Sequence, residues 1–325
     1  MRVLLTGAAG FVGRAVEPAL VSAGSDVVAY DRARCAADDV TDLDRVRSAT
    51  AGCDAVIHLA AKVGLGVDLG DIDDYVRSND LGTAVVLRAA AEAGVRRVVY
   101  ASSMVVYGEG GYRCPTHGPA RPPARSVTDL EHGRFDPRCP ACDAALEPTL
   151  VTESAPFDPR NVYAATKVHG EHLLAAWARE SGGTGAALRF HNVYGPGMPE
   201  HTPYAGVAAL FRSSLLAGSP PQVFEDGRQR RDFVHVSDVA AAVVAATTVP
   251  LGPGCTSLNI GSGEVITIGE VASLLATAMA GPAPEVTGRF RLGDVRHITA
   301  DSSAARTVLG WSPHYRVADG LRAGL

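Results

Sequence analysis

A tyrosine and a lysine four residues apart, Tyr163 and Lys167, form the pair in this sequence whose chemistry is easiest to read. Side chains at this spacing lie on one face of a helix. A nearby cation lowers the pKa of a phenol toward working pH, so Tyr163 is predicted to act as a general acid and base. Lys167 is one of only two lysines among 30 basic residues, so chance rarely produces the pairing. A hydroxyl of Ser102 or Ser103, at the end of a predicted strand, could share a proton with Tyr163.

A glycine-rich turn marks a second site, between the first predicted strand and the first predicted helix. Glycines at such a turn let the backbone approach a pyrophosphate at the helix N-terminus. The residues expected to surround that group are Gly7, Gly10, Phe11, Val12 and Gly13. Asp31 ends the second predicted strand, where its carboxylate can accept hydrogen bonds from an adenosine ribose. The pattern predicts a bound dinucleotide. Asp31 favours NAD because it repels a 2′-phosphate, whereas Arg32 and Arg34 leave NADP open.

The elements that must position these residues alternate between apolar runs and helical patterns. Residues 2–6, 26–30, 54–59 and 97–101 are apolar on both faces, as buried parallel strands are. Helices are predicted over 11–23, 42–51, 72–93 and 161–180. The series indicates an α/β fold with a doubly wound parallel sheet of the Rossmann type. Further strands at 186–190 and 257–260, with helices at 204–217, 237–247 and 267–280, complete the chain.

Residues 109–159 break this pattern with Gly, Pro, Arg and Cys. They contain a Cys-x2-His pair followed by a Cys-x2-Cys pair, which is the spacing of a structural zinc ribbon with two knuckles. The predicted ligands are Cys114, His117, Cys139 and Cys142. Four protein ligands leave no open position for catalysis, and zinc would order a loop that lacks a core. Reduced thiols beside an unrelated histidine are the alternative. A nucleic-acid-binding ribbon is disfavoured because few aromatics accompany the local arginines.

Composition limits the function classes. The 325 residues suffice for about two domains, with 46% hydrophobic and 20% charged residues. A net charge of -5 provides no general field for nucleic acid or an anionic membrane. No apolar run is long enough to span a bilayer, and the first apolar run enters the glycine turn rather than a signal-peptide cleavage site. The sequence therefore predicts a cytoplasmic protein with no nucleic-acid or membrane partner.

Taken together, these motifs resemble the extended short-chain dehydrogenase/reductases, specifically the NAD-dependent nucleotide-sugar epimerase/dehydratase family. The resemblance assigns the catalytic hydroxyl to Ser103, within the segment 101–108, next to Tyr163 and Lys167. It adds cofactor contacts, for a tightly bound NAD, at Arg32, Asp39, Val40, Leu59, Ala60, Ala61, Asn79, Tyr163, Lys167 and Phe190. It places a nucleotide sugar, dTDP- or UDP-linked, on Ser103, Asn192, Arg231, Arg291 and Asp294. His191 departs from the aromatic residue that the family has there.

The resemblance also implies a domain division and an assembly. Residues 1–188 would form the NAD-binding domain, which carries the insert 109–159. Residues 189–325 would form the smaller nucleotide-sugar domain, with about 232–262 returning to the main sheet. Helices 72–93 and 161–180 would form a homodimer interface. The insert is similar to that of the dTDP-L-rhamnose 4-epimerase-like subgroup, and we expect it to pack near the pocket mouth and shape sugar selectivity.

The residues after Ser103 bear on the reaction. The family's 4,6-dehydratases place an Asp-Glu pair directly after the catalytic hydroxyl, whereas Met104 and Val105 stand here and cannot transfer a proton. This disfavours a dehydratase and an acid-dependent decarboxylase. The resemblance then implies 4-epimerisation through a 4-keto intermediate, with NAD taking and returning the C4 hydride, on a substrate such as dTDP-L-rhamnose. A one-way NAD(P)H-dependent 4-ketoreductase and a non-catalytic dinucleotide sensor are the alternatives.

Overall fold

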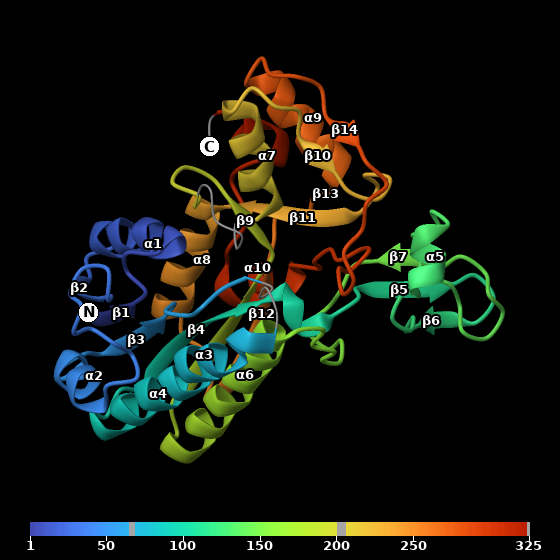
Figure 1. Ribbon diagram of the computed structural model, residues 1–325. Coiled ribbons are helices and arrows are strands. Elements are labelled where there is room, and N and C mark those ends of the chain that lie inside the picture. The colour runs from blue at the N-terminus through green and yellow to red at the C-terminus, as the bar shows by residue number, and fades with distance from the viewer. Residues whose placement is uncertain (65–68, 200–205, 324–325) are drawn as a thin grey trace.

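A six-stranded parallel sheet forms the centre of the protein in the computed structural model, which describes residues 1–64, 69–199 and 206–323 (Figure 1). The strand order is β12-β8-β4-β3-β1-β2, and every neighbouring pair is parallel. The strands are β1 (Arg2–Thr6), β2 (Asp26–Tyr30), β3 (Ala55–His58), β4 (Arg97–Ser103), β8 (Thr184–Phe190) and β12 (Gly254–Ile260). The predicted Rossmann-type fold is confirmed. The order reverses between β1 and β3, so the strands' carboxyl ends leave a crevice there for a ligand.

Helices cover both faces of this sheet. Successive side chains of β1 alternate between two cores, because Val3 and Leu5 pack on one face and Leu4 on the other. The first core includes residues of α1 (Phe11–Ser22), α8 (Val236–Thr248) and α10 (Ser303–Leu309). The second includes residues of α2 (Leu43–Thr50), α4 (Gly82–Glu92) and α6 (Val162–Ser181). Apolar side chains on both faces of the strands are therefore buried against helices. This explains why the strand sequences are apolar throughout rather than alternating with polar residues.

The helix predicted over 72–93 is interrupted. It consists of α3 (Ile72–Tyr75), a π-helical turn (Val76–Leu81) and α4. Buried Asn79 lies in the π turn, where its amide accepts from the Lys62 backbone N–H (2.7 Å) and donates to the Lys62 carbonyl (3.0 Å) and the Thr166 hydroxyl (3.0 Å). These bonds tie the loop after β3 to α6. The π turn is wider than a turn of α-helix, and it occurs here where the Asn79 side chain makes these bonds. Hydrophobic periodicity in the sequence does not predict such a turn.

A smaller unit lies above the carboxyl ends of the strands (Figure 1). It contains a three-stranded sheet, in the order β13-β11-β9, and the pair β10-β14. Its elements are β9 (Asn192–Tyr194), α7 (Val207–Leu216), β10 (Gln222–Val223), β11 (Arg230–His235), β13 (Val265–Thr267), α9 (Ile268–Ala278), β14 (Glu285–Val286) and α11 (Val317–Arg322). The expected start of α7, residues 204–205, lies outside the described residues. Between β11 and β13 the chain returns to the main sheet as α8 and β12, and α10 packs there too.

The insert 109–159 projects from the opposite side to α1 and α2 (Figure 1). The composition of the insert suggests irregular structure, but the insert contains short strands and a helix. An antiparallel sheet, in the order β6-β5-β7, is accompanied by one short helix. The elements are β5 (Gly111–Cys114), β6 (Gly118–Ala120), α5 (Val127–Glu131) and β7 (Glu147–Thr149). Its core is small, with Tyr112, Cys114, Cys139 and Leu146 buried together. Among the described residues, no helix is long and apolar enough to cross a membrane.

Gly170 allows α6 to pack closely on β4. A Cβ at this position would overlap the Tyr100 hydroxyl and ring. We expect Gly170→Ala to lower the free energy of unfolding by about 1–3 kcal/mol, although alanine is the better helix former. Urea denaturation measures this. Gly252→Ala, where a Cβ would meet no atom within 4 Å, serves as control and should unfold like the wild type. Equal stability of the two variants would contradict the close packing.

Candidate active site

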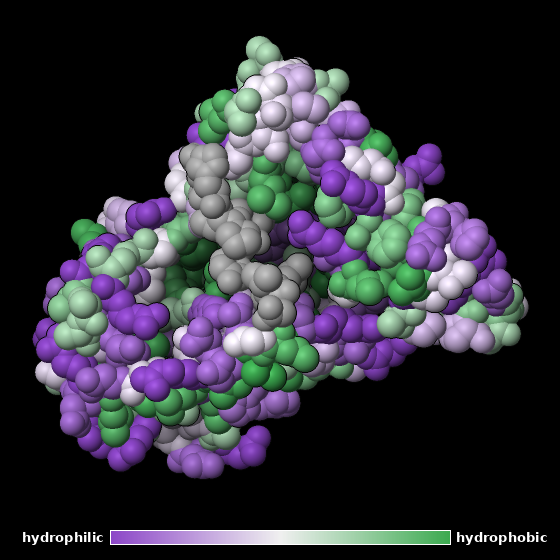
Figure 2. Space-filling view, viewed as in Figure 1, coloured by the Kyte–Doolittle hydropathy of each residue, from purple (hydrophilic) through white to green (hydrophobic). Residues whose placement is uncertain are grey.

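A cavity of about 910 Å³ lies between the main sheet and the smaller unit. Figure 2 shows the molecule hollowed at this place, with hydrophobic residues in the hollow beside the residues drawn in grey. The glycine turn forms one wall. Gly7 has φ +73°, and a Cβ there would lie 2.7 Å from the Ala60 backbone nitrogen. A Cβ on Gly13 would collide with the Gly7 carbonyl. Larger residues at these positions would force the turn apart, so the glycines keep it compact at the helix N-terminus, which suits an incoming pyrophosphate.

Most of the residues predicted to bind the cofactor line this cavity. They are Gly7, Gly10, Phe11, Val12, Gly13, Asp31, Arg32, Asp39, Val40, Leu59, Ala60, Ala61 and Tyr163. Asp31 accepts hydrogen bonds from the backbone N–H groups of Ala9 (2.9 Å) and Ala33 (2.8 Å), which fix its carboxylate at the end of β2. Arg32 pairs with Asp39 at 3.4 Å rather than with Asp31. An acid thus stands where a 2′-phosphate would be repelled.

Three predicted cofactor residues, Asn79, Lys167 and Phe190, do not line the cavity. Asn79 instead holds the loop after β3, as described above. Phe190 is buried in the core between α1, α8 and the sheet. Lys167 lies behind Tyr163. A residue's position in a sequence motif does not show whether it lines the cavity or lies behind the lining and supports it. The sequence therefore did not separate these two roles.

Tyr163 and Lys167 extend from the first turns of α6 toward the end of β4. The Lys167 ammonium is buried, donates to the Ala101 carbonyl at 2.7 Å and lies 5.6 Å from the centre of the Tyr163 ring. The Ser103 hydroxyl lies near enough to the Tyr163 phenol to lower its pKa. The structure therefore brings together the three predicted catalytic residues, and Asn161 caps α6 by accepting from the Ala164 N–H at 2.8 Å.

The expected effect of Lys167 on Tyr163 is not present in the protein alone. Burial raises the pKa of Tyr163 to about 12, although the nearby Ser103 hydroxyl opposes the rise. Burial also lowers the pKa of Lys167 to about 8, against the opposite effect of the Glu171 carboxylate. The lowered phenol pKa was expected from this cation together with a bound nicotinamide ring and stays a prediction for that state; in the protein alone, desolvation outweighs the single nearby cation. Another positive charge in the cavity beside Tyr163 would lower the phenol's pKa.

Glu171 and Arg189 are site-supporting residues that the sequence analysis missed. Both are buried, and the Arg189 guanidinium binds the two Glu171 carboxylate oxygens at 2.9 and 2.7 Å. Glu171 also accepts from the Ser102 hydroxyl, so Ser102 serves this pair and Ser103 faces Tyr163. The sequence did contain a pattern that pointed to Glu171. It follows Lys167 by four residues, so both side chains lie on the same face of the helix.

Two further polar residues at the cavity have unused hydrogen-bonding groups. The Asn192 side-chain oxygen and both ring nitrogens of His191 are buried without a partner, and both residues line the cavity. Burial of such groups without partners is costly, so a polar ligand in the cavity suits them. Met104 also lines the cavity next to Ser103. A thioether cannot transfer a proton, so Met104 supplies no acid or base next to Ser103.

Arg231, Arg291 and Asp294 lie together but outside the lining of this cavity. Burial raises the pKa of Asp294, while the charges of Arg231 and Arg291 lower it. The Arg291 guanidinium is exposed and stands 5.1 Å from the centre of the Phe224 ring. Arg231 donates to the carbonyls of Val295 (2.7 Å) and Arg296 (2.9 Å). The guanidinium groups of this cluster, which we call the arginine cluster, suit an anionic ligand.

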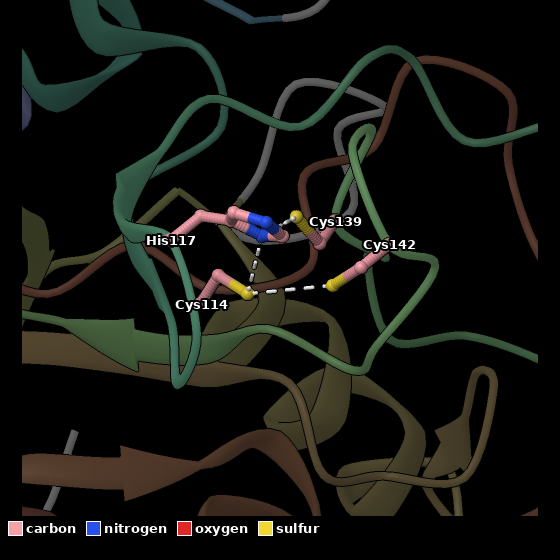
Figure 3. Close-up of side chains that lie close together, drawn as sticks. All are labelled: Cys114, His117, Cys139 and Cys142. Carbon is pink, nitrogen blue, oxygen red and sulfur yellow. Dashed lines mark hydrogen bonds between the residues drawn. The ribbon is translucent and has the colours of Figure 1, made fainter.

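The four predicted metal ligands of the insert converge from two turns (Figure 3). Their ligand atoms all lie within 4.8 Å of one another. His117 Nδ1 lies 3.5 Å from Cys114 Sγ and 3.6 Å from Cys139 Sγ, and Cys114 Sγ lies 3.7 Å from Cys142 Sγ. Tetrahedral zinc with bonds of ~2.3 Å to sulfur and ~2.0 Å to nitrogen separates two sulfurs by ~3.8 Å and sulfur from nitrogen by ~3.5 Å. The donor set and its spacing fit zinc.

No residue of the insert lines the cavity, and the expectation that the insert packs near the pocket mouth stays a prediction. The insert contacts the arginine cluster instead. Arg125 of the insert donates to the Asp294 carbonyl at 2.6 Å. Gly110 and Val151, at the two ends of the insert, donate to the carbonyls of His297 (3.0 Å) and Thr299 (2.8 Å). The sequence places the insert correctly between β4 and α6, but its direction depends on these contacts with the C-terminal part of the chain.

Comparison with known proteins agrees with this geometry. Residues 3–128 and 141–261 match the NAD dependent epimerase/dehydratase family. The chain is 33% identical to a dTDP-L-rhamnose 4-epimerase of Burkholderia thailandensis, over 98% of this chain and 93% of the relative. It is 32% identical to a UDP-glucose 4-epimerase of Mycolicibacterium smegmatis, over 99% and 96%. Among solved structures, MoeE5 in complex with UDP-glucuronic acid and NAD has a TM-score of 0.79 and 31% identity, over 99% and 96%.

The buried Lys167 makes a prediction about stability against pH. Its pKa is about 8 in the folded protein and ~10.4 when unfolded, so the unfolded chain binds more protons between these values. Stability therefore rises with pH in that window. From pH 7 to pH 9, urea denaturation should show the wild type gaining about 1 kcal/mol relative to Lys167→Met.

Lys62→Met is the control for this experiment. Lys62 pairs with Asp71 and Asp74, and its pKa is raised, so it stays protonated in both states across the window. The difference between the wild type and Lys62→Met should not change from pH 7 to pH 9. An equally flat difference for Lys167→Met would show that Lys167 is not desolvated.

Proposed function

The chain belongs to the NAD dependent epimerase/dehydratase family, and on that premise we propose that it is an NAD-dependent nucleotide-sugar 4-epimerase. The observation that carries the proposal is the Ser103–Tyr163–Lys167 group at the cavity wall, with Met104 beside it where a dehydratase would need an acid. This site can move one proton at a hydroxyl, and Met104 supplies no acid beside Ser103 for elimination of water. An isomerase that oxidises and then reduces the same carbon needs no more than this.

NAD in the cavity would lie along the glycine turn, with its adenosine ribose at Asp31 and its adenine near Asp39 and Val40. When bound, it supplies a hydride acceptor at the C4 carbon of the sugar and a positive charge near Tyr163. Asp31 supports NAD over NADP because its carboxylate repels a 2′-phosphate. The loop Leu59–Ala61, which packs against Gly7, would form the wall beside the cofactor.

The residues of this chain would handle the proton. Tyr163 Oη takes the proton of the 4-hydroxyl as the hydride leaves C4, and Ser103 holds the same sugar oxygen while sharing its proton with Tyr163. Lys167, fixed on the Ala101 carbonyl, stabilises the negative charge that develops on the phenol. After the 4-keto sugar turns over, the hydride returns to the opposite face and Tyr163 gives the proton back.

The nucleotide would be held by the cavity's Asn192 and by the arginine cluster, with Arg231 and Arg291 on the diphosphate and Asp294 on the ribose. Guanidinium groups bind phosphates as planar forks, so a few suffice despite the net charge of -5. The named substrates of the relatives include both dTDP- and UDP-sugars. We propose a dTDP-6-deoxyhexose such as dTDP-L-rhamnose as the first substrate to assay, because the relative with that activity shares 33% of its residues with this chain.

Two other functions differ in measurable ways. A 4-ketoreductase would consume NAD(P)H in proportion to product, and Asp31 disfavours the phosphorylated cofactor that such enzymes normally use. A non-catalytic dinucleotide sensor would bind the cofactor without turnover, and the complete Ser103–Tyr163–Lys167 group argues against it. The family match and the intact site favour the isomerase.

We further propose that the Cys/His group of the insert holds one structural zinc ion. Four ligands at tetrahedral spacing would complete the metal's coordination and leave no position for a substrate. The small core around Tyr112 and Leu146 suits an element that needs a metal to fold.

A homodimer through α3, α4 and α6 also belongs to the proposal. The exposed apolar side chains of Ile72, Val76 and Leu81 on this helical segment support it, since such side chains gain from burial in an interface. A cytoplasmic location stays a prediction.

Tyr163→Phe tests the mechanism. Removal of the phenol oxygen should lower the rate of C4 inversion by about 10²–10⁴-fold while the content of bound NAD stays unchanged, because the ring still fills the wall. NMR of a nucleotide-sugar panel with dTDP-L-rhamnose, UDP-glucose and UDP-glucuronic acid measures inversion. Tyr315→Phe removes a hydroxyl remote from the cavity lining and serves as control. A Tyr163→Phe protein with near wild-type turnover would refute the assignment.

Cys139→Ser tests the zinc site. Elemental analysis of the wild type should find one zinc per chain, and the variant should lose most of it and melt earlier, because binding of structural zinc is coupled to folding. Cys35→Ser, an exposed cysteine outside the insert, should keep its zinc. Absence of zinc from the wild type, or full zinc in Cys139→Ser, would refute the site.

A further inference from the structure

The insert is joined to the rest of the protein by a buried group of charges. Arg296 is fully buried, and its guanidinium donates to Asp136 of the insert at 2.8 Å. It also donates to Glu225 at 2.9 Å and to both carboxylate oxygens of Asp226 at 2.7 and 2.9 Å. The backbone N–H of Arg296 donates to the Glu109 carboxylate at 3.0 Å. The Arg296–Glu225 pair is removed from water, with side chains 1% and 3% exposed, whereas Asp136 is 55% exposed. Ion pairs removed from water fix geometry more than they add stability, so the buried pair fixes the place to which the insert is joined.

Arg125 makes a second set of bonds from the insert. Its side chain is 6% exposed, and it donates to Glu225 at 2.8 Å and to the Asp294 carbonyl at 2.6 Å. Glu225 thus binds Arg125 with one carboxylate oxygen and Arg296 with the other. Its φ of +53° is a left-handed conformation that costs a non-glycine residue free energy. Its backbone N–H donates to the Arg289 carbonyl at 2.7 Å, and the two arginines fix its carboxylate.

The segment 294–296 therefore accepts and donates hydrogen bonds on two sides. Arg125 and Glu109 of the insert bind its Asp294 carbonyl and Arg296 N–H. From the other side, Arg231 donates to the carbonyls of Val295 at 2.7 Å and Arg296 at 2.9 Å. The carbonyls that orient Arg231 are thus in the same segment that the insert holds. A shift of the insert would move both Arg231 and Asp294.

We propose that the insert sets the affinity of the nucleotide site, with Arg125 as the positioning residue that fixes 294–296 and, through these carbonyls, Arg231. This inference rests on the proposed function, because it takes the arginine cluster as the diphosphate site. No residue of the insert lines the cavity that holds Tyr163. Loss of the contact should therefore weaken binding of the nucleotide and leave the chemical step unchanged.

The test compares wild type, Arg125→Met and Arg134→Met as the NAD-loaded, full-length protein. Arg134 belongs to the same insert but is exposed and pairs with Asp129 alone. Calorimetric titration with UDP and with dTDP gives the dissociation constant of each. For the tighter ligand, Arg125→Met should raise that constant roughly tenfold or more, as expected for a lost buried charge-assisted contact. The KM for the nucleotide sugar should rise by a similar factor, while kcat, NAD content and the Arg134→Met values match wild type.

Several results would overturn the inference. Unchanged nucleotide affinity in Arg125→Met would do so, as would a loss of kcat at constant KM. If Arg125→Met does not fold, Arg125→Lys decides, because lysine keeps the charge but cannot reach both acceptors as a fork. Wild-type affinity in Arg125→Lys would then overturn it. Failure of the wild type to bind UDP, dTDP or any nucleotide sugar would instead overturn the proposed function, on which the inference rests.

Discussion

The close packing of α6 on β4 is the constraint on which the site depends. Gly170 lets the helix backbone approach the Tyr100 ring, and three residues earlier the Lys167 ammonium reaches the Ala101 carbonyl. The same approach puts Tyr163 beside Ser103 at the end of β4. Because open parallel sheets bind ligands at the carboxyl ends of their strands, this contact delivers an acid–base group to the place where a ligand can lie.

Buried charge is used in two ways around this contact. Arg189 and Glu171 satisfy each other and fix the helix to β8. Lys167 has a carbonyl and two tyrosine rings as neighbours, so burial lowers its pKa to about 8 while the pKa of Tyr163 rises to about 12. A phenol in this environment holds its proton until further positive charge enters the cavity. The protein is thus arranged so that proton transfer depends on what is bound beside Tyr163.

Periodicity and motifs predict much of this structure. The β-strands of the first hundred residues, the glycine turn and the Tyr163–Lys167 pair follow from local patterns that report burial and helix faces, whereas the choice of Ser103 over Ser102 came from the family resemblance. Features that depend on long-range contacts do not. The π turn at Asn79 reflects bonds to Lys62 and Thr166. The direction of the insert depends on ion pairs between Asp136 and Arg296. The raised pKa of Tyr163 depends on desolvation, which sequence spacing cannot show.

The central claim is that one carbon of a nucleotide sugar is oxidised and reduced again within one cavity, with Tyr163 moving only the hydroxyl proton. The most direct test is turnover of an accepted nucleotide sugar in D2O, followed by NMR and mass spectrometry. Direct hydride return predicts inversion at C4 with no solvent deuterium on any sugar carbon, because the C4 hydrogen never exchanges with water. Deuterium incorporated at C3 or C5 would show proton abstraction from carbon and would contradict the account.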